Sequence, residues 1–248
     1  MRILSIDSSL GTQLAVVDTA EAVDAADTDS ATGRRALRVL TQAEQTDTRR
    51  HAESLGQMLS ESLSAPDVAD CPLDAVVAAI GPAPFTGLRA GLVTAEVVGR
   101  TRGVPVHGVP SLDAVARAAF DEIARAGGGG GESVLVVTDA RRHEVYAARY
   151  RARGADDVEP LDSPAVLAPD AAVRLGGVDA VAGSGAVLYP HLAAGRVVLA
   201  PVSGDPAAQI RVALTRLADA GPGGVLPAEP LYLRHADVHM PAGRGRTL

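Results

Sequence analysis

Five consecutive glycines at 127–131 divide the chain near its middle. Neither a helix nor a strand tolerates such a run in its interior, so the run predicts a flexible connector. The 248 residues suffice for two modest domains, and a hydrophobic content of 47% supplies the apolar surface that folded cores need. We therefore expect an N-terminal lobe at 1–126, a C-terminal lobe at 132–234 and a tail at 235–248.

The first lobe opens with two short aliphatic runs, residues 2–7 and 12–18, on either side of Ser8-Ser9-Leu10-Gly11. Two such runs joined by a short turn rich in Gly and Ser predict a β-hairpin. After it, segments with apolar residues every three or four positions alternate with continuous apolar runs, which indicates helices between buried strands. Further strands are expected at 36–40, 73–80 and 104–109, and helices at 49–63, 87–102 and 111–125.

The second lobe repeats the opening of the first. Residues 133–139 and 144–150 form another pair of aliphatic runs, and Asp139 ends the first of them as Asp7 ends residues 2–7. Residues 178–185 then lead an apolar run into a glycine turn. The pattern indicates one duplication of an α/β unit rather than an array of short repeats.

Composition excludes several classes of protein. The formal net charge is −7 and aromatic residues make up 2%, with no Trp, so the chain lacks both a basic surface for phosphate backbones and many flat faces for unpaired bases. Any RNA contact is expected to come through another subunit. The single cysteine, Cys71, forms no internal disulfide, and the sequence shows neither a signal-peptide core nor a membrane-spanning run. We expect a cytoplasmic protein.

The most informative loop is Gly81-Pro82-Ala83-Pro84-Phe85-Thr86-Gly87-Leu88-Arg89-Ala90-Gly91, which leaves a predicted strand and enters a predicted helix. Free backbone N–H groups at such a helix start can hold an anion. Alternatively, the glycines serve only backbone geometry and Thr86 caps the helix. The loop is not a P-loop, because no Gly-Lys-Ser/Thr follows.

This loop resembles the corresponding motif of the TsaB family, and so do other segments in the same order along the chain. These are Ile6-Asp7-Ser8-Ser9, His51-Ala52-Glu53-Ser54-Leu55, Val109-Pro110-Ser111-Leu112-Asp113-Ala114, residues 139–146 and Pro230-Leu231-Tyr232-Leu233-Arg234. The resemblance is strong over residues 1 to about 150 and thin beyond, and Ala83-Pro84 replaces the family's usual Gly-Ser. It implies a duplicated actin-like, sugar-kinase-like (ASKHA, ribonuclease H-like) two-lobed α/β fold with mixed central sheets.

The resemblance also implies a function. Members of the family are non-catalytic subunits that support a TsaD-like transferase, which forms N6-threonylcarbamoyladenosine next to the tRNA anticodon. It implies a homodimer when the chain is alone, a TsaE-like ATPase as a further partner, tRNA contact only through the complex, and no cofactor of the chain's own, with ATP and metal on partner subunits. The alternative is an independent ATP-dependent phosphotransferase of the sugar-kinase class, favoured by the fold and by Asp7.

No catalytic residue is predicted. Vestigial nucleotide-binding candidates are Asp7, Gly81, Thr86, Arg89 and Asp139. The metal-binding His-x-x-x-His of the transferase has no counterpart at 109–115, and the pair His235 and His239 falls in the tail, where we expect solvated chain rather than a metal site. Hydrolase chemistry is not expected, since no serine lies in a Gly-x-Ser-x-Gly elbow and Cys71 has no identifiable base.

Small residues recur at every fourth position of the predicted helix at 87–102, namely Gly87, Gly91, Ala95 and Gly99. Such a small-residue strip lets another backbone approach closely, either that of a partner or that of the chain's own sheet. The family resemblance favours a partner. The predicted interface residues are His51, Leu55, Leu59, Leu88, Gly91, Leu92, Ala95 and Gly99.

Overall fold

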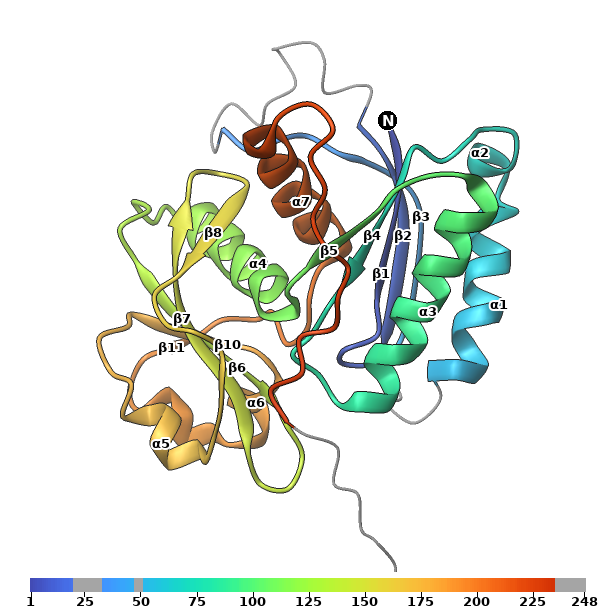
Figure 1. Cartoon of the computed structure of the whole chain (residues 1–248). Helices are drawn as coiled ribbons and strands as arrows, with labels where there is room; N and C mark the ends of the chain where they lie inside the picture. Colours follow the sequence, from blue (N-terminus) through green and yellow to red (C-terminus); the bar gives the residue numbers. More distant parts are fainter. Residues whose placement is uncertain (20–32, 47–50, 235–248) are drawn as a thin grey trace, which may run out of the picture.

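The computed structural model describes residues 1–19, 33–46 and 51–234, except for the side chains of 51–53. It contains two mixed β-sheets, each with helices on both faces (Figure 1). This arrangement confirms the predicted α/β fold of two similar lobes.

The central strand of the first sheet is buried on both faces. Leu4 and Ile6 point into one apolar cluster and Ile3 points into another, which explains why this strand is a nearly continuous apolar run. The order is β3-β2-β1-β4-β5, and β1 is antiparallel to β2 and parallel to β4. The strands are β1 (Arg2–Asp7), β2 (Thr12–Asp18), β3 (Arg38–Gln45), β4 (Ala75–Ala79) and β5 (Val106–Val109).

One face of this sheet is covered by helices that are close in sequence, α1 (His51–Leu63), α2 (Pro66–Ala69) and α3 (Phe85–Arg102). The opposite face is covered by α7 (Pro206–Ala220), which comes from near the other end of the chain. Ile210, Val212 and Ala213 of α7 pack against this face. The first lobe is therefore completed by a helix from the second half of the sequence.

The second sheet has the order β11-β10-β6-β7-β8, with β9 paired to β7. Its strands are β6 (Ser133–Asp139), β7 (Val145–Arg153), β8 (Asp157–Pro160), β9 (Ala165–Leu167), β10 (Ala180–Ala182) and β11 (Val197–Val198). One face carries α5 (Pro169–Val173), α6 (Ser184–Leu188) and the 3-10 helix Pro190–Ala193. The other carries α4 (Ser111–Arg125), a helix from the first half of the chain whose Leu112 and Phe120 join the second lobe's core.

The two sheets share one connection pattern. In each, a central strand pairs antiparallel with the next strand and parallel with the strand that follows a helical crossover, as β6 does with β7 and β10. Asp7 lies opposite Gln13 in the first hairpin, and Asp139 lies opposite Val145 in the second. The predicted duplication is confirmed, including its alignment of Asp7 with Asp139.

Some predicted boundaries differ from the structure. The strand expected at 36–40 spans Arg38–Gln45, and the helix expected at 87–102 begins at Phe85. Pro84 precedes that helix with φ of −57° and no side-chain cap, and Thr86 is exposed, so the predicted Thr86 cap is wrong. Proline already holds the φ that a helix start requires. The helix ends as predicted at Gly103, with φ of 68°.

The glycine run at 127–131 lies between α4 and β6. Because α4 packs on the second sheet and α7 on the first, the lobes exchange helices across this connector. A domain boundary at the glycines stays a prediction. The tail at 235–248, with His235 and His239, lies outside the described residues.

The small-residue strip faces the chain's own sheet, which corrects the interface prediction. A Cβ added to Gly91 would lie 2.2 Å from Ser8 Oγ, and one added to Gly99 would lie 2.4 Å from a methyl group of Val106. Ala95 is fully buried in the same helix. Glycine and alanine are needed here because α3 passes directly over the β1–β2 turn and β5.

The predicted apolar interface residues belong to the same core. Leu55 of α1 and Leu88 and Leu92 of α3 are buried in the cluster over the first sheet, and Leu59 packs partly buried against it. The side chain of His51 lies outside the described residues. These leucines stabilise the monomer and offer little surface to a partner.

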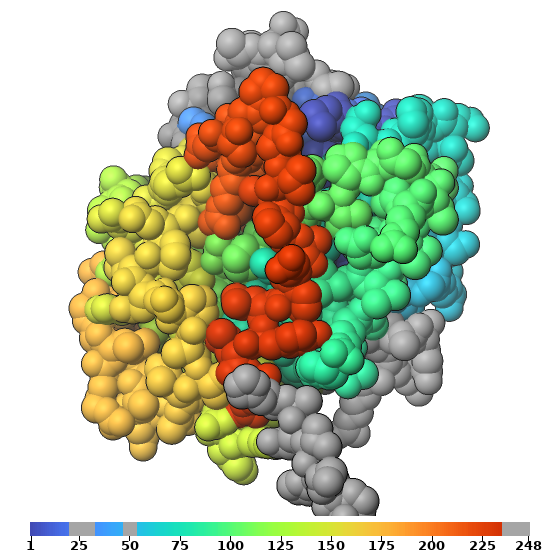
Figure 2. Space-filling view, in the orientation of Figure 1, coloured from blue at the N-terminus to red at the C-terminus, as the bar shows by residue number. Residues whose placement is uncertain are grey.

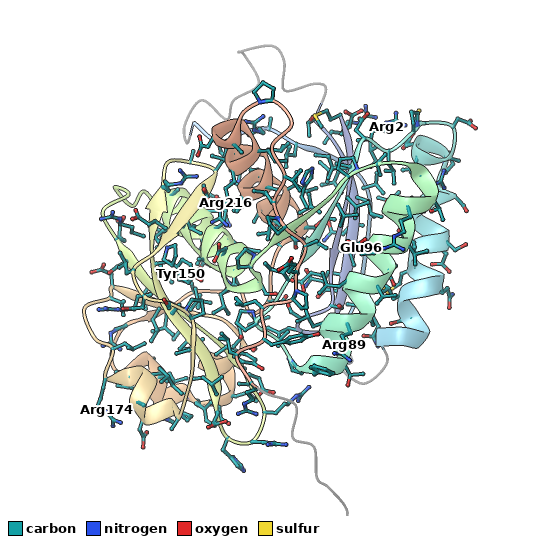
Figure 3. All side chains as sticks on the ribbon, in the orientation of Figure 1. Arg2, Arg89, Glu96, Tyr150, Arg174 and Arg216 are labelled. Carbon is teal, nitrogen blue, oxygen red and sulfur yellow. The ribbon has the colours of Figure 1, made fainter. Side chains whose placement is uncertain are left out.

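Buried charges join the lobes where α4, α7 and the β7–β8 hairpin meet (Figure 3). Arg216 of α7 lies 2.8 Å from Asp113 of α4 and 2.9 Å from Asp157 of β8, whose side chains are 6% and 0% exposed. Tyr150 donates a hydrogen bond of 2.9 Å to Asp113. Burial raises the pKa of Asp113, and the charge of Arg216 opposes that rise. Arg216 therefore compensates two largely buried carboxylates, of which Asp157 also pairs with Arg153.

Replacing this cation should destabilise the fold strongly. Arg216→Met leaves Asp113 and Asp157 buried without it, and we expect the free energy of unfolding to fall by about 3–5 kcal/mol in urea titrations. The difference in unfolding free energy between the variant and the unchanged chain should shrink as the pH falls through the raised pKa of Asp113, because protonated Asp113 needs no cation. Arg151→Met, which breaks an exposed pair with Glu159, should cost under about 1 kcal/mol. Equal losses of unfolding free energy in Arg216→Met and Arg151→Met would contradict the role of Arg216 as a cation that the buried carboxylates require.

The packing of the small-residue strip gives a second test. Ala95→Leu should overpack the core beneath α3 and lower the stability of the isolated chain by about 1–3 kcal/mol. The exposed Ala218→Leu on α7 is the matched control and should change stability by under about 0.5 kcal/mol. A normally stable Ala95→Leu monomer that no longer associates would instead restore the strip as a partner surface.

Candidate functional site

The candidate site residues cluster at the carboxyl ends of the two central strands and in the loops beside them. Asp7 ends β1, Asp139 ends β6, and Gly81 lies just after β4. Thr86 and Arg89 lie in the first two turns of α3, and Figure 3 shows Arg89 at that end of the helix. The fold thus brings Asp7 and Asp139 to equivalent positions of the two lobes.

The carboxylate of Asp7 is enclosed by its own chain. Its Oδ1 accepts hydrogen bonds from the backbone N–H of Ser9, at 2.7 Å, and from the Ser9 hydroxyl, at 2.6 Å. Gly204 lies against Oδ2 so closely that an added Cβ would be 2.7 Å from it. Gln13 donates to the Ser203 hydroxyl at 2.7 Å and holds this segment in place. The space beside Asp7 is filled by the chain leading into α7.

Ser8, in the β1–β2 turn, connects that turn to α3. The Ser8 hydroxyl donates to the carbonyl of Gly87 at 2.7 Å and accepts from the N–H of Gly91 at 3.1 Å. Ser8 thus bonds a carbonyl and an N–H that lie four residues apart in α3. These contacts fix the helix against the β1–β2 turn.

Asp139 organises the β6–β7 turn. Its Oδ1 accepts from the backbone N–H of Arg141 at 2.8 Å, and its Oδ2 lies 3.1 Å from the Arg141 guanidinium. Burial, and then the charge of Asp139, raise the pKa of Tyr146. The Tyr146 phenol therefore stays protonated and donates to the carbonyl of Ala83 at 3.2 Å. This bond ties the second lobe to the loop that precedes α3.

The loop after β4 is held from two sides. Gly81, with φ of 94°, accepts from the N–H of Ser111 at 2.7 Å and donates to the Ser111 hydroxyl at 3.1 Å. Ile80 accepts from the N–H of Leu231 at 2.7 Å. Gly81 thus serves a left-handed backbone position that is bonded to the start of α4, and the adjacent Ile80 is bonded to the C-terminal segment.

The outer side of α3 carries an apolar groove that is lined by Leu92, a predicted interface residue, and by exposed valines that the sequence analysis did not name. Val93 and Val97 are 62% and 54% exposed, and they lie about half a turn around the helix from Gly91 and Ala95. The C-terminal segment borders them, so that a groove of about 580 Å³ runs along the helix. Figure 2 shows this segment, coloured orange-red, crossing the surface between the lobes. The signal in the sequence was the pair of valines four residues apart.

The groove has a charged rim. Arg89, Glu96 and Arg100 border the exposed valines along α3, and Ala228, Pro230 and Tyr232 close the opposite side. Within 1–19, 33–46 and 51–234, no group of three or more His, Cys, Asp or Glu side chains is placed to hold a metal ion. None of the described helices is long and apolar enough to cross a membrane.

Comparison with known proteins identifies the family. A family model described as TsaD, tRNA N6-adenosine threonylcarbamoyltransferase, matches residues 38–195. An uncharacterised protein of Mycobacterium tuberculosis is 38% identical over 208 residues, which cover 83% of this chain and 85% of that protein. One from Mycobacterium leprae is 45% identical over 123 residues, 50% of this chain and 30% of that longer protein.

Two further relatives carry informative names. The tRNA threonylcarbamoyladenosine biosynthesis protein TsaB of Escherichia coli is 28% identical over 198 residues, 75% of this chain and 82% of that protein. The solved structure of YeaZ from Pseudomonas aeruginosa has a TM-score of 0.67 at 23% identity, and covers 94% of this chain and 99% of that one, which establishes a shared fold. The TsaD family model matches more than half of the chain, and relatives from Escherichia coli and Haemophilus influenzae are named TsaB. The chain therefore belongs to the TsaB family.

Proposed function

We propose that the chain is a non-catalytic accessory subunit in the formation of N6-threonylcarbamoyladenosine next to the tRNA anticodon. It forms a homodimer when alone and binds a TsaD-like transferase subunit in the working complex, which includes a TsaE-like ATPase. The partners hold tRNA, ATP and metal, and the complex works in the cytoplasm. The name of the Escherichia coli relative supports the pathway.

The groove on α3 carries the proposal. Its centre is apolar and exposed at Val93 and Val97, and its rim is charged at Arg89, Glu96 and Arg100. An apolar centre with a polar rim is the composition of protein interfaces. A neighbouring helix, α1, packs beside α3 on the same side of the sheet and extends the surface. We infer that a partner helix lies in this groove.

The enclosure of Asp7 supports a non-catalytic role. A phosphotransferase of the sugar-kinase class would need this carboxylate to reach a metal ion or the phosphates of a nucleotide. In this chain Ser9 engages one carboxylate oxygen, and Gly204 packs against the other. The accessory role therefore fits the packing better than the phosphotransferase alternative does.

Charging the groove should abolish association without unfolding the chain. Val97→Asp places a carboxylate in the apolar centre, and we expect homodimerisation and transferase binding to weaken at least about tenfold, the loss typical of a disrupted interface centre. Sedimentation velocity and co-purification with the transferase subunit measure the two effects. The matched control is Val187→Asp on α6, a valine of the second lobe that is 64% exposed. If Val97→Asp associates as Val187→Asp does, the groove is not the interface.

The isolated chain should release no phosphate from ATP above the buffer background. The physical reason is that Asp7 is occupied by the turn and by Gly204, so it cannot position a metal-bound nucleotide. A coupled phosphate-release assay on the purified chain checks this. Steady turnover that disappears in an Asp7→Ala variant with an unchanged circular dichroism spectrum would overturn the non-catalytic proposal.

A further inference from the structure

A pocket of about 330 Å³ lies at the C-terminal end of α4. Its walls are the last turns of α4, the glycine run that follows, and the β7–β8 turn at Gly154 and Ala155. The β6–β7 and β7–β8 turns stand at opposite ends of β7 (Figure 1). The pocket is therefore at the far end of the second sheet from Asp139, and neither Asp139 nor Asp7 lines it.

The side of α4 that borders the pocket carries a row of charged residues. Arg117, Asp121 and Arg125 follow one another at four-residue steps, which places them on one side of the helix. All three line the pocket. Arg125, in the last turn, is exposed, whereas Arg117 is only 3% exposed. The row thus offers two cations, one of them deeply buried, for one carboxylate.

The carboxylate of Asp121 is shared among several guanidinium groups. Nη2 of Arg117 lies 3.2 Å from its Oδ1, and Arg211 of α7 pairs with both of its oxygens. Nη1 of Arg34 lies 3.6 Å from its Oδ2. Among the residues that the structure describes, Asp121 is the only carboxylate that forms an ion pair with Arg117. The charge of Arg117 is therefore balanced by a share of one carboxylate.

Arg117 also has a donor without an acceptor. Its Nη1 donates to the carbonyls of Gly154, at 3.2 Å, and Asp157, at 3.1 Å. Its Nε is buried and has no hydrogen-bond partner within the described parts of the chain. Burial lowers the pKa of Arg117, and the charge of Asp121 opposes that shift. A buried, charged donor that lacks an acceptor is unfavourable, so the site requires an acceptor from outside the chain.

The end of α4 does not oppose an anion in this pocket. The N–H groups of residues 126–128 donate to the carbonyls of residues 122–124 at 2.9–3.1 Å, so the last turn is capped. Arg125 lies beside these carbonyls and offsets the negative end of the helix dipole. Glu132 accepts from the N–H of Gly129 at 2.9 Å and does not line the pocket.

We propose that this pocket binds a small oxyanion, a phosphate or a carboxylate, which accepts a hydrogen bond from Arg117 Nε and pairs with Arg125. Guanidinium groups match the oxygens of both anions. A cation would instead meet two arginines and a carboxylate that already has three cationic neighbours. A water molecule would satisfy the Nε donor but would leave the charge uncompensated. The proposal rests neither on the partner groove nor on the non-catalytic role.

The test is the melting temperature of the full-length chain in 10 mM sodium phosphate, measured against sodium chloride at equal ionic strength. A ligand that binds only the folded state raises this temperature, and a Kd of about 1 mM predicts a rise of about 3–6 °C. Sodium acetate is measured in the same way. The anion with the larger shift identifies the site as one for phosphate or for carboxylate.

A substitution at the exposed arginine separates this site from the general effect of phosphate salts, which acts on every variant alike. Arg125→Gln removes one charged contact, so the Kd should rise about tenfold and the temperature shift should fall to roughly a third. Arg102→Gln is the matched control, because Arg102 is an exposed arginine in the last turn of α3 and does not line the pocket. It should keep the full shift.

A second variant fills the pocket without changing its charge. Ala124 lines the pocket and is half-buried, so the longer side chain of Ala124→Leu should occupy the space of the anion. We expect this variant to melt normally in chloride and to show less than about a third of the shift in phosphate or acetate. Arg117 itself is left unchanged, because its contacts with α7 and the β7–β8 turn belong to the folded core.

Three results would overturn the proposal. They are the absence of a shift with both anions, equal shifts in Arg125→Gln and Arg102→Gln, and a full shift in Ala124→Leu. The first would mean that water alone occupies the space beside Arg117. These measurements use the chain without partners, so their failure would leave the accessory role untouched. Val97→Asp, which disrupts the groove on α3, should keep the full shift.

Discussion

The relative position of the lobes depends on α4 and α7, which are exchanged between the halves of the chain and lie against each other. The contacts between these helices and the β7–β8 hairpin include several buried ion pairs. Arg117 and Arg211, each 3% exposed, both contact Asp121, and Arg216 joins Asp113 to Asp157. A buried charge is tolerated only with its partner in place, so these pairs favour one arrangement of the helices. The segment over Asp7 depends on that arrangement.

The duplicated fold could be predicted because its signals are local. Residues 2–7 and 133–139 are apolar runs that end in an aspartate, and each is followed by a turn and a returning strand. The role of α7 could not be predicted in this way. Its buried positions include Gln209 and Arg211, which no apolar pattern reveals, and their partners lie far away in sequence. Burial of a polar side chain depends on a tertiary neighbour, and a single sequence does not record that neighbour.

The candidate site shows the same division between local and distant information. The sequence places Asp7 at the end of a strand, but the residue that closes over it, Gly204, is almost two hundred positions away. The small-residue strip was ambiguous for a related reason, since close approach to a partner and to the chain's own sheet require the same residues. The turn at Ser8 decides between them, because it leaves no space for a Cβ at Gly91.

Tyr232 joins the C-terminal segment to the start of α3. It borders the groove on α3, its ring lies 5.0 Å from that of Phe85, and its hydroxyl accepts a hydrogen bond of 2.9 Å from Arg89. The Arg89 guanidinium in turn lies 3.7 Å above the Phe85 ring. Contacts between a cation and aromatic faces add to the packing of the rings themselves. The stack formed by Arg89, Phe85 and Tyr232 therefore holds the two sides of the groove, which come from distant parts of the sequence, against each other.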